Sequence, residues 1–99
     1  MMAPDKLERA RQDIQKLRGK GGVKPSKFEG LAKSLGRTKH KRGSEPTWVN
    51  PKHPDWRPLS IPHHGSKDIN KHTGRSILDQ LEEDIERLEE EREDQREAD

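Results

Sequence analysis

The chain has 99 residues, of which 24% are hydrophobic and 40% are charged, and its mean hydropathy is −1.41. This length and composition support one small domain with a modest core, and the absence of cysteine excludes disulfide bonds and thiolate zinc sites. No apolar run approaches the roughly 20 residues of a membrane span, and no signal-peptide pattern is present. We therefore expect a cytoplasmic protein that does not enter a membrane.

The formal net charge of +2 conceals a strong asymmetry along the chain. Residues 79–99 hold twelve acids and three bases, whereas residues 1–78 hold eighteen bases and seven acids. A basic body favours a polyanionic partner, because Lys and Arg displace condensed counterions from phosphates. The acidic tail indicates something that competes with this partner for the basic surface.

Two helices are predicted in the first third of the chain. Residues 5–18 carry apolar side chains at steps of three and four, which is typical of an amphipathic helix, and Asp5 is suited to cap it. This apolar stripe consists of Leu7, Ala10, Ile14 and Leu17. A second helix is predicted over residues 26–36, with Ser26 as its N-terminal cap and Gly36 as its end.

Three short strands are predicted next, over residues 37–41, 46–50 and 57–61, with a turn at Gly43-Ser44. A three-stranded sheet would give the flanking helices a layer against which they can pack. The predicted core is drawn mainly from the middle of the chain. It consists of Phe28, Leu31, Leu35, Trp48, Val49, Leu59, Ile61, Ile69, Ile77 and Leu78.

A long helix is predicted from about Thr73 into the acidic tail. Its apolar stripe extends over two heptads, which are too few to predict a coiled coil. The stripe consists of Leu78, Leu81, Ile85 and Leu88. It needs a partner, and both the N-terminal helix of the same chain and a second copy of the chain offer a matching surface.

Two segments of the chain resemble motifs of the HicA family, the small toxins of bacterial and archaeal toxin–antitoxin pairs. The first is "KRGSEPTW" (residues 41–48), in which basic residues precede Gly43-Ser44. The second is "IPHHGSKDINKHTGRSIL" (residues 61–78), which contains the Ile-Pro-x-His and Thr-x-Arg-Ser-Ile-Leu patterns that are typical of the family. The resemblance covers roughly residues 24–82.

The resemblance implies an α+β fold like that of the double-stranded-RNA-binding domain, α-β-β-β-α. To this core the sequence adds the predicted N-terminal helix and an extended acidic C-terminal helix. The chain is thus divided into a helical extension with a Gly-rich linker (1–22), an RNA-binding and nuclease domain (23–82) that carries the resemblance, and an acidic helical tail (83–99). Family members bind and cleave messenger RNA and are neutralised by a HicB antitoxin. The implied partners are therefore messenger RNA and a HicB-like antitoxin.

One position departs from the family pattern. A catalytic histidine usually follows the Gly-Ser pair, whereas this chain has Glu45 there. RNA cleavage without a metal needs a base for the 2′-hydroxyl proton and an acid for the leaving oxygen, and a free glutamate, with a pKa of about 4.3, is a weak base unless burial raises that pKa. The candidate catalytic residues are Glu45 and His64, and His64 matches the family's Ile-Pro-x-His position. The alternative for Glu45 is an exposed acid in a turn, and the alternative for His64 is a loop histidine that bonds to the backbone.

The candidate RNA-binding residues gather near the two motifs. Lysine, arginine and serine side chains suit phosphate oxygens, and a tryptophan ring suits stacking on a base. They are Lys39, Lys41, Arg42, Ser44, Trp48, Lys67 and Arg75. The alternatives are a solvated charged surface for the bases and a place in the core for Trp48.

The sequence therefore predicts a HicA-like mRNA interferase, a metal-independent endoribonuclease without a cofactor, because the five histidines lack the spacing of metal ligands. Two other functions stay open: a catalytically inactive RNA-binding module of the same fold, and an interaction protein that works through its helices. For the apolar stripe of the tail, three partners stay open: the N-terminal helix, a second copy in a dimer, and an antitoxin.

Overall fold

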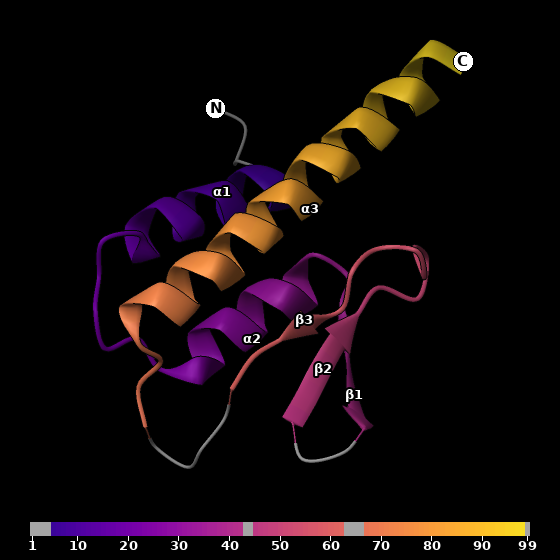
Figure 1. The fold of residues 1–99 in the computed structure, drawn as a ribbon. Helices are drawn as coiled ribbons and strands as arrows, with labels where there is room; N and C mark the ends of the chain where they lie inside the picture. The colour runs from indigo at the N-terminus through magenta and orange to yellow at the C-terminus, as the bar shows by residue number, and fades with distance from the viewer. Residues whose placement is uncertain (1–4, 43–44, 63–66, 99) are drawn as a thin grey trace.

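A computed structural model of the chain describes residues 5–42, 45–62 and 67–98. Three helices and three strands follow one another in this part of the chain. They are α1 (Lys6–Leu17), α2 (Pro25–Ser34), β1 (Thr38–Arg42), β2 (Glu45–Val49), β3 (Leu59–Ser60) and α3 (Lys71–Ala98). The strands form an antiparallel sheet in the order β1-β2-β3, so the predicted α+β class is confirmed. Figure 1 shows α3 running across the molecule, with α1 on one side and the sheet on the other.

Helix α1 begins where the sequence predicts. The side chain of Asp5 accepts a hydrogen bond of 2.9 Å from the backbone N–H of Glu8, which satisfies one of the free donors at the helix N-terminus. Leu7, Ala10 and Ile14 of the predicted stripe are buried. The helix is held by its packing, because an isolated helix of this length is marginal in water.

Helix α2 differs from the prediction at its start and agrees with it at its end. Pro25 occupies the first turn, where its missing N–H has no partner to lose. Ser26 therefore already lies inside the helix, and its predicted capping role is wrong; the capping position belongs to Lys24, whose side chain makes no capping hydrogen bond. The end is confirmed, because Gly36 has φ of 95°, a conformation that glycine adopts without steric cost.

The sheet is built on a hairpin, in which Thr38 pairs with Val49 and Arg42 pairs with Glu45. The first two predicted strands are each displaced by one residue. The third is much shorter than predicted, since only Leu59 and Ser60 pair with β2. The residue before this strand is a proline, which has no N–H to donate to a ladder.

One hydrophobic core joins the helices to a single face of the sheet, the face that carries Trp48 and Leu59. Nine of the ten predicted core residues are buried. Val49 is the exception and is half-buried, because side chains alternate along a strand and its neighbour Trp48 takes the inner face. Trp48 is 1% exposed.

Helix α1 belongs to the same core. Its buried residues Leu7, Ala10 and Ile14 join the cluster that contains Leu81 and Ile85 of α3. The apolar stripe of the tail is therefore covered by the N-terminal helix of its own chain, the first of the three partners considered above. Burial of each leucine or isoleucine side chain in this contact is worth about 1.5–3 kcal/mol before entropy is counted.

Ion pairs between α1 and α3 border this apolar contact. Arg18, the C-cap residue of α1, pairs with Glu82 and with Asp79, the latter at 2.9 Å. Desolvation opposes the positive charge of Arg18, but its hydrogen bonds to these two carboxylates outweigh that effect and raise its pKa. Bases of the N-terminal helix thus neutralise part of the acidic charge on α3.

A buried ion pair fixes the sheet to α3. The side chains of Arg37 and Asp84 are each 1% exposed. Arg37 donates to both carboxylate oxygens of Asp84, at 2.6 and 3.0 Å, and also to the backbone carbonyls of Trp48 and Arg57. Such bidentate geometry is directional, so it fixes how α3 is placed against the strands.

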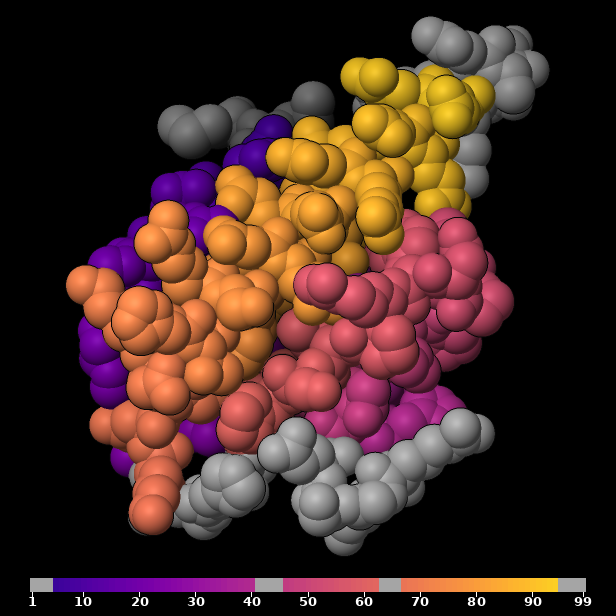
Figure 2. All heavy atoms as spheres, viewed as in Figure 1, coloured from indigo at the N-terminus to yellow at the C-terminus, as the bar shows by residue number. Residues whose placement is uncertain are grey.

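The C-terminal part of α3 extends beyond the body of the protein, as Figures 1 and 2 show. Asp84 and Ile85 are still buried and Leu88 is half-buried, whereas Glu93 and Asp94 are exposed. The first turn of the predicted tail (83–99) therefore contributes to the core. No helix in the described ranges combines the length and apolar character that crossing a membrane requires.

Candidate nucleic-acid interface

The outer face of the sheet carries a row of polar side chains. Because Trp48 and Leu59 point to the core, the next register row lies on the opposite face. In that row His40 of β1 is opposite Thr47 of β2, and Thr47 is opposite Ser60 of β3. His40 and Ser60 are exposed and Thr47 is half-buried, so this row offers an imidazole and two hydroxyls to a ligand on the sheet.

The predicted catalytic position lies next to this row. Glu45 begins β2 and is the register partner of Arg42, two residues along each strand from Thr47 and His40. The backbones of residues 41, 42 and 45 are described, whereas the side chains of Lys41, Arg42 and Glu45 lie outside the description. The predicted residues Ser44 and His64 lie outside the described residues altogether.

The prediction that Trp48 stacks on a base is corrected by the structure. Its ring lies in the core, 1% exposed, with the Lys33 ammonium 5.8 Å from the ring centroid. A base therefore cannot reach either face of the ring while the core is intact. The chain has only three aromatic residues, and the core uses this one because few other large apolar side chains are present.

The predicted phosphate-binding bases that the structure describes are exposed. Lys39 lies on the edge strand β1, Lys67 precedes α3, and Arg75 lies in the second turn of α3. The side chain of Asn70 caps α3, accepting a hydrogen bond of 2.8 Å from the N–H of Thr73. This cap starts the helix at residue 71, two residues earlier than predicted.

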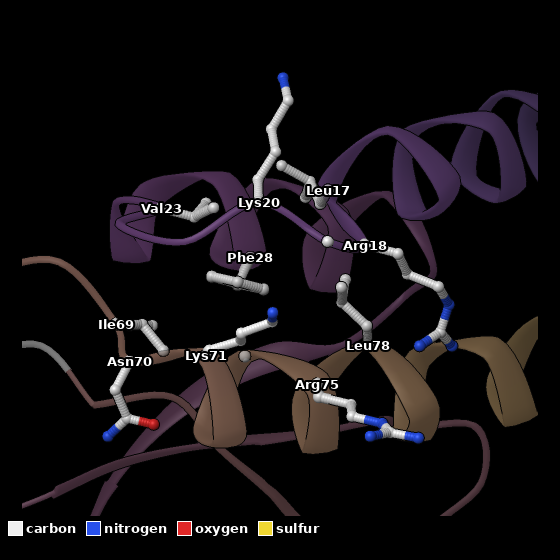
Figure 3. A pocket seen from close by; sticks show the side chains of 12 residues that line it. Leu17, Arg18, Lys20, Val23, Phe28, Ile69, Asn70, Lys71, Arg75 and Leu78 are labelled. Carbon is white, nitrogen blue, oxygen red and sulfur yellow. The ribbon is translucent and has the colours of Figure 1, made fainter.

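A pocket of about 300 Å³ lies where the end of α1, helix α2 and the first turns of α3 meet. Figure 3 shows Lys71 and Arg75 extending from α3 along one side of it. The lining between the helices is mainly apolar. Its apolar side chains are those of Leu17, Val23, Phe28, Ile69 and Leu78.

The walls of this pocket are held by backbone contacts. The N–H of Ile69 donates to the carbonyl of Val23 at 2.8 Å, which ties the loop after α1 to the segment before α3. Gly74 lets α3 approach α2 closely, since a Cβ at this position would lie 3.3 Å from Cζ of Phe28. The pocket is thus built by the fold rather than by a loose loop.

Sequence reasoning missed two parts of this surface. His40 was counted among the histidines without a role, and only the strand register shows that it shares a face with Thr47 and Ser60. The pocket was not predicted, because residues 1–22 are assigned to a helical extension and a Gly-rich linker outside the RNA-binding domain. The available signals were the apolar Leu17 and Val23 at the two ends of the Gly-rich segment.

Among the described residues, no three or more His, Cys, Asp or Glu side chains gather as a metal site would require. The described surface can offer hydrogen bonds, positive charge and an apolar pocket to a ligand. Comparison with protein-family models, with curated proteins and with solved structures gave no match.

Proposed function

We propose that this protein is a HicA-like RNA-binding protein with a fold of the double-stranded-RNA-binding type, and that it cleaves RNA. One observation carries the proposal. The elements α2-β1-β2-β3-α3 follow the order expected from the resemblance, with exposed bases at both motifs: Lys39 lies two residues before the first motif, and Lys67 and Arg75 lie within the second. Polyanion binding depends on such bases.

In this proposal, RNA lies across the end of the hairpin. Lys41, Arg42 and Ser44 bind the phosphate, Glu45 removes the 2′-hydroxyl proton, and His64 protonates the leaving oxygen. His40, in the neighbouring register row, is a further candidate for proton transfer, because histidine is the side chain most often used in general acid–base catalysis. The protein acts on messenger RNA in the cytoplasm and is neutralised by a HicB-like antitoxin.

The test of cleavage is an assay of the purified protein on single-stranded RNA with a chelator present. We expect products with 2′,3′-cyclic phosphate ends, and we expect Glu45→Gln to lower the rate by about 100-fold or more while RNA affinity changes little. Asp55→Asn, a change of an exposed acid outside the motifs, is the matched control. Absence of RNA binding by the wild-type protein would reject the proposal.

The second candidate is a catalytically inactive RNA-binding module of the same fold. The observation that favours it is Glu45, which stands where the family usually has its histidine. The discriminating change is Glu45→His. If the wild-type protein binds RNA without cleaving it and the variant cleaves, the native chain is a binding module.

A further inference from the structure

We infer that the pocket between α1, α2 and α3 receives one unstacked base of single-stranded RNA, while Lys71 and Arg75 bind the neighbouring phosphates. The inference rests on the proposed RNA-binding function and names the form of RNA that the protein selects. Its physical basis is the combination of an apolar pocket with two cations at one side (Figure 3). A nucleotide has the complementary arrangement, a flat ring with apolar faces joined to an anionic backbone.

The pocket offers apolar surface that the protein itself leaves partly uncovered. Leu17 and Val23 are half-buried although they pack against the core, whereas Phe28 and Ile69 are buried at the bottom of the pocket. A volume of about 300 Å³ lies at the small end of the range for ligand pockets. In sites that hold an extruded nucleotide, apolar as well as aromatic side chains contact the faces of the base.

The charge at the side of the pocket is available to a ligand. Lys71 and Arg75 are exposed and lie four residues apart, on one face of α3, with about 6 Å between them along the helix axis. Within the described part of the chain, neither has an ion-pair partner. Arg18, which also lines the pocket, is already paired with Asp79 and Glu82.

This geometry selects unpaired RNA. In a continuous duplex both faces of each base are covered by its neighbours, and extrusion of a base costs the energy of unpairing and unstacking. A single strand, a bulge or a loop offers a base without that cost. The expected preference is therefore opposite to that of the double-stranded-RNA-binding domains, which read the shape of a duplex.

The experiment compares two strands with identical phosphates: a short abasic strand, and the same strand with one central adenine. We expect the strand with the base to bind about 10-fold or more tightly. Val23→Trp, which fills the pocket, should abolish this difference and leave the salt dependence unchanged. Leu88→Trp, a similar change at a half-buried position of α3 that does not line the pocket, is the matched control and should keep the difference.

A double change of Lys71 and Arg75 to Gln should weaken both strands equally and lower the slope of log affinity against log salt by about one for each lost phosphate contact. If Val23→Trp does not fold, NMR of the wild-type protein replaces it. The methyl groups of Leu17 and Val23 should then shift with the adenine strand and not with the abasic strand.

Equal affinity for the two strands would overturn the base-binding role of the pocket and leave RNA binding intact. Binding of neither strand, nor of any longer RNA, would reject the proposed function and this inference with it. A third result also overturns the inference. In that result, an acidic peptide with one tryptophan shifts the NMR signals of the pocket methyl groups and the adenine strand does not. The pocket would then be assigned to a protein partner.

Discussion

Arg37 and Asp84 bring opposite charges into the core, where their geometry decides whether they stabilise the fold. Removing two ions from water is expensive, and the cost is recovered only when the pair is well placed and hydrogen bonded. Here four hydrogen bonds satisfy the guanidinium, two of them to the carboxylate of Asp84. The pair therefore orients α3. The fold loses most stability when only one of the two partners is removed.

We expect Asp84→Ala to lower the free energy of unfolding by about 3–5 kcal/mol, because it leaves the Arg37 charge buried without a counter-ion. Chemical denaturation measures the change. Asp79→Ala is the control: Asp79 also pairs with an arginine, but its side chain is 61% exposed, so a loss of about 0–1 kcal/mol is expected. Equal losses for the two variants would contradict this account of the buried pair.

The cap of α1 makes stability depend on pH. The hydrogen bonds that Asp5 accepts from the backbone of Glu8 and from Arg92 lower its pKa below the ordinary value of 3.8. Because the folded-state pKa is the lower one, the contribution of Asp5 to stability is complete above the unfolded-state pKa and is lost as pH falls through the folded-state pKa.

The variant Asp5→Asn tests this pH dependence, because it keeps a capping oxygen and removes the titrating carboxyl group. The difference in stability between wild type and variant should therefore shrink between about pH 5 and pH 2, as denaturation curves at both pH values would show. If the stability difference between wild type and variant stays the same at both pH values, the charge of the Asp5 carboxylate does not contribute to the stability of the fold.

Side-chain chemistry was predictable at some of these positions and not at others. The cap at Asp5 and the stop at Gly36 follow from local rules, and both are found. Ser26 fits the same capping rule, but the neighbouring Pro25 is compatible with the first helical turn and moves the start of α2. The burial of Arg37 was not predictable, because it requires Asp84, which is distant in sequence.

At the scale of elements, periodicity predicted the helices better than it predicted their partners. The stripes of α1 and α3 indicate that something covers them, and only the fold shows that they cover each other. Strand prediction was less accurate because prolines interrupt the pairing, so β3 keeps only Leu59 and Ser60. The pocket depends on where α1 ends relative to α3, and a sequence pattern does not contain that information.

The exposed end of α3 should weaken RNA binding through charge repulsion. Deleting residues 93–99 removes four acids and one base and keeps the contacts of Glu91 with His53 and of Arg92 with Asp5. We expect the truncated protein to bind RNA more tightly at about 0.05 M salt, with the gain disappearing near 0.5 M, where screening is strong. Fluorescence anisotropy at both salt concentrations measures this.

The control for the truncation is a full-length protein with Glu93→Gln and Asp94→Asn, which removes two charges and keeps the helix. It should show part of the same gain at low salt. Unchanged affinity in both proteins at low salt would mean that the tail does not repel RNA. A deletion from residue 84 would not be informative, because it also removes the buried Asp84 and Ile85.

At the scale of the whole molecule, the three segments predicted from the sequence share one core. Residues from the extension (1–22), the central domain (23–82) and the tail (83–99) all contribute to it. The charge asymmetry of the sequence is partly reduced in the fold, because acids of α3 pair with bases of α1. Lys71 and Arg75, the bases of α3 beside the pocket, form no ion pair with another described residue.

Neutralising Lys41 and Arg42 together should test whether the hairpin carries the RNA-binding charge. We expect affinity to fall for all RNA sequences and the slope of log affinity against log salt to decrease by roughly two, about one per lost phosphate contact. Changing Arg9 and Lys16 to Gln removes the same charge from exposed positions of α1 and should leave the slope nearly unchanged. A similar decrease in both variants would indicate a diffuse charge effect.

The packing of α1 against α3 also has a consequence for the order in which the protein folds. Arg18 and Glu82 are 64 residues apart in sequence, and contacts between such distant residues form late because a long loop must close first. During synthesis, the apolar stripe of α1 leaves the ribosome well before Leu81 and Ile85, which cover it. The nascent chain therefore exposes this stripe to chaperones and to aggregation until α3 has emerged, and α1 docks only as the core is completed.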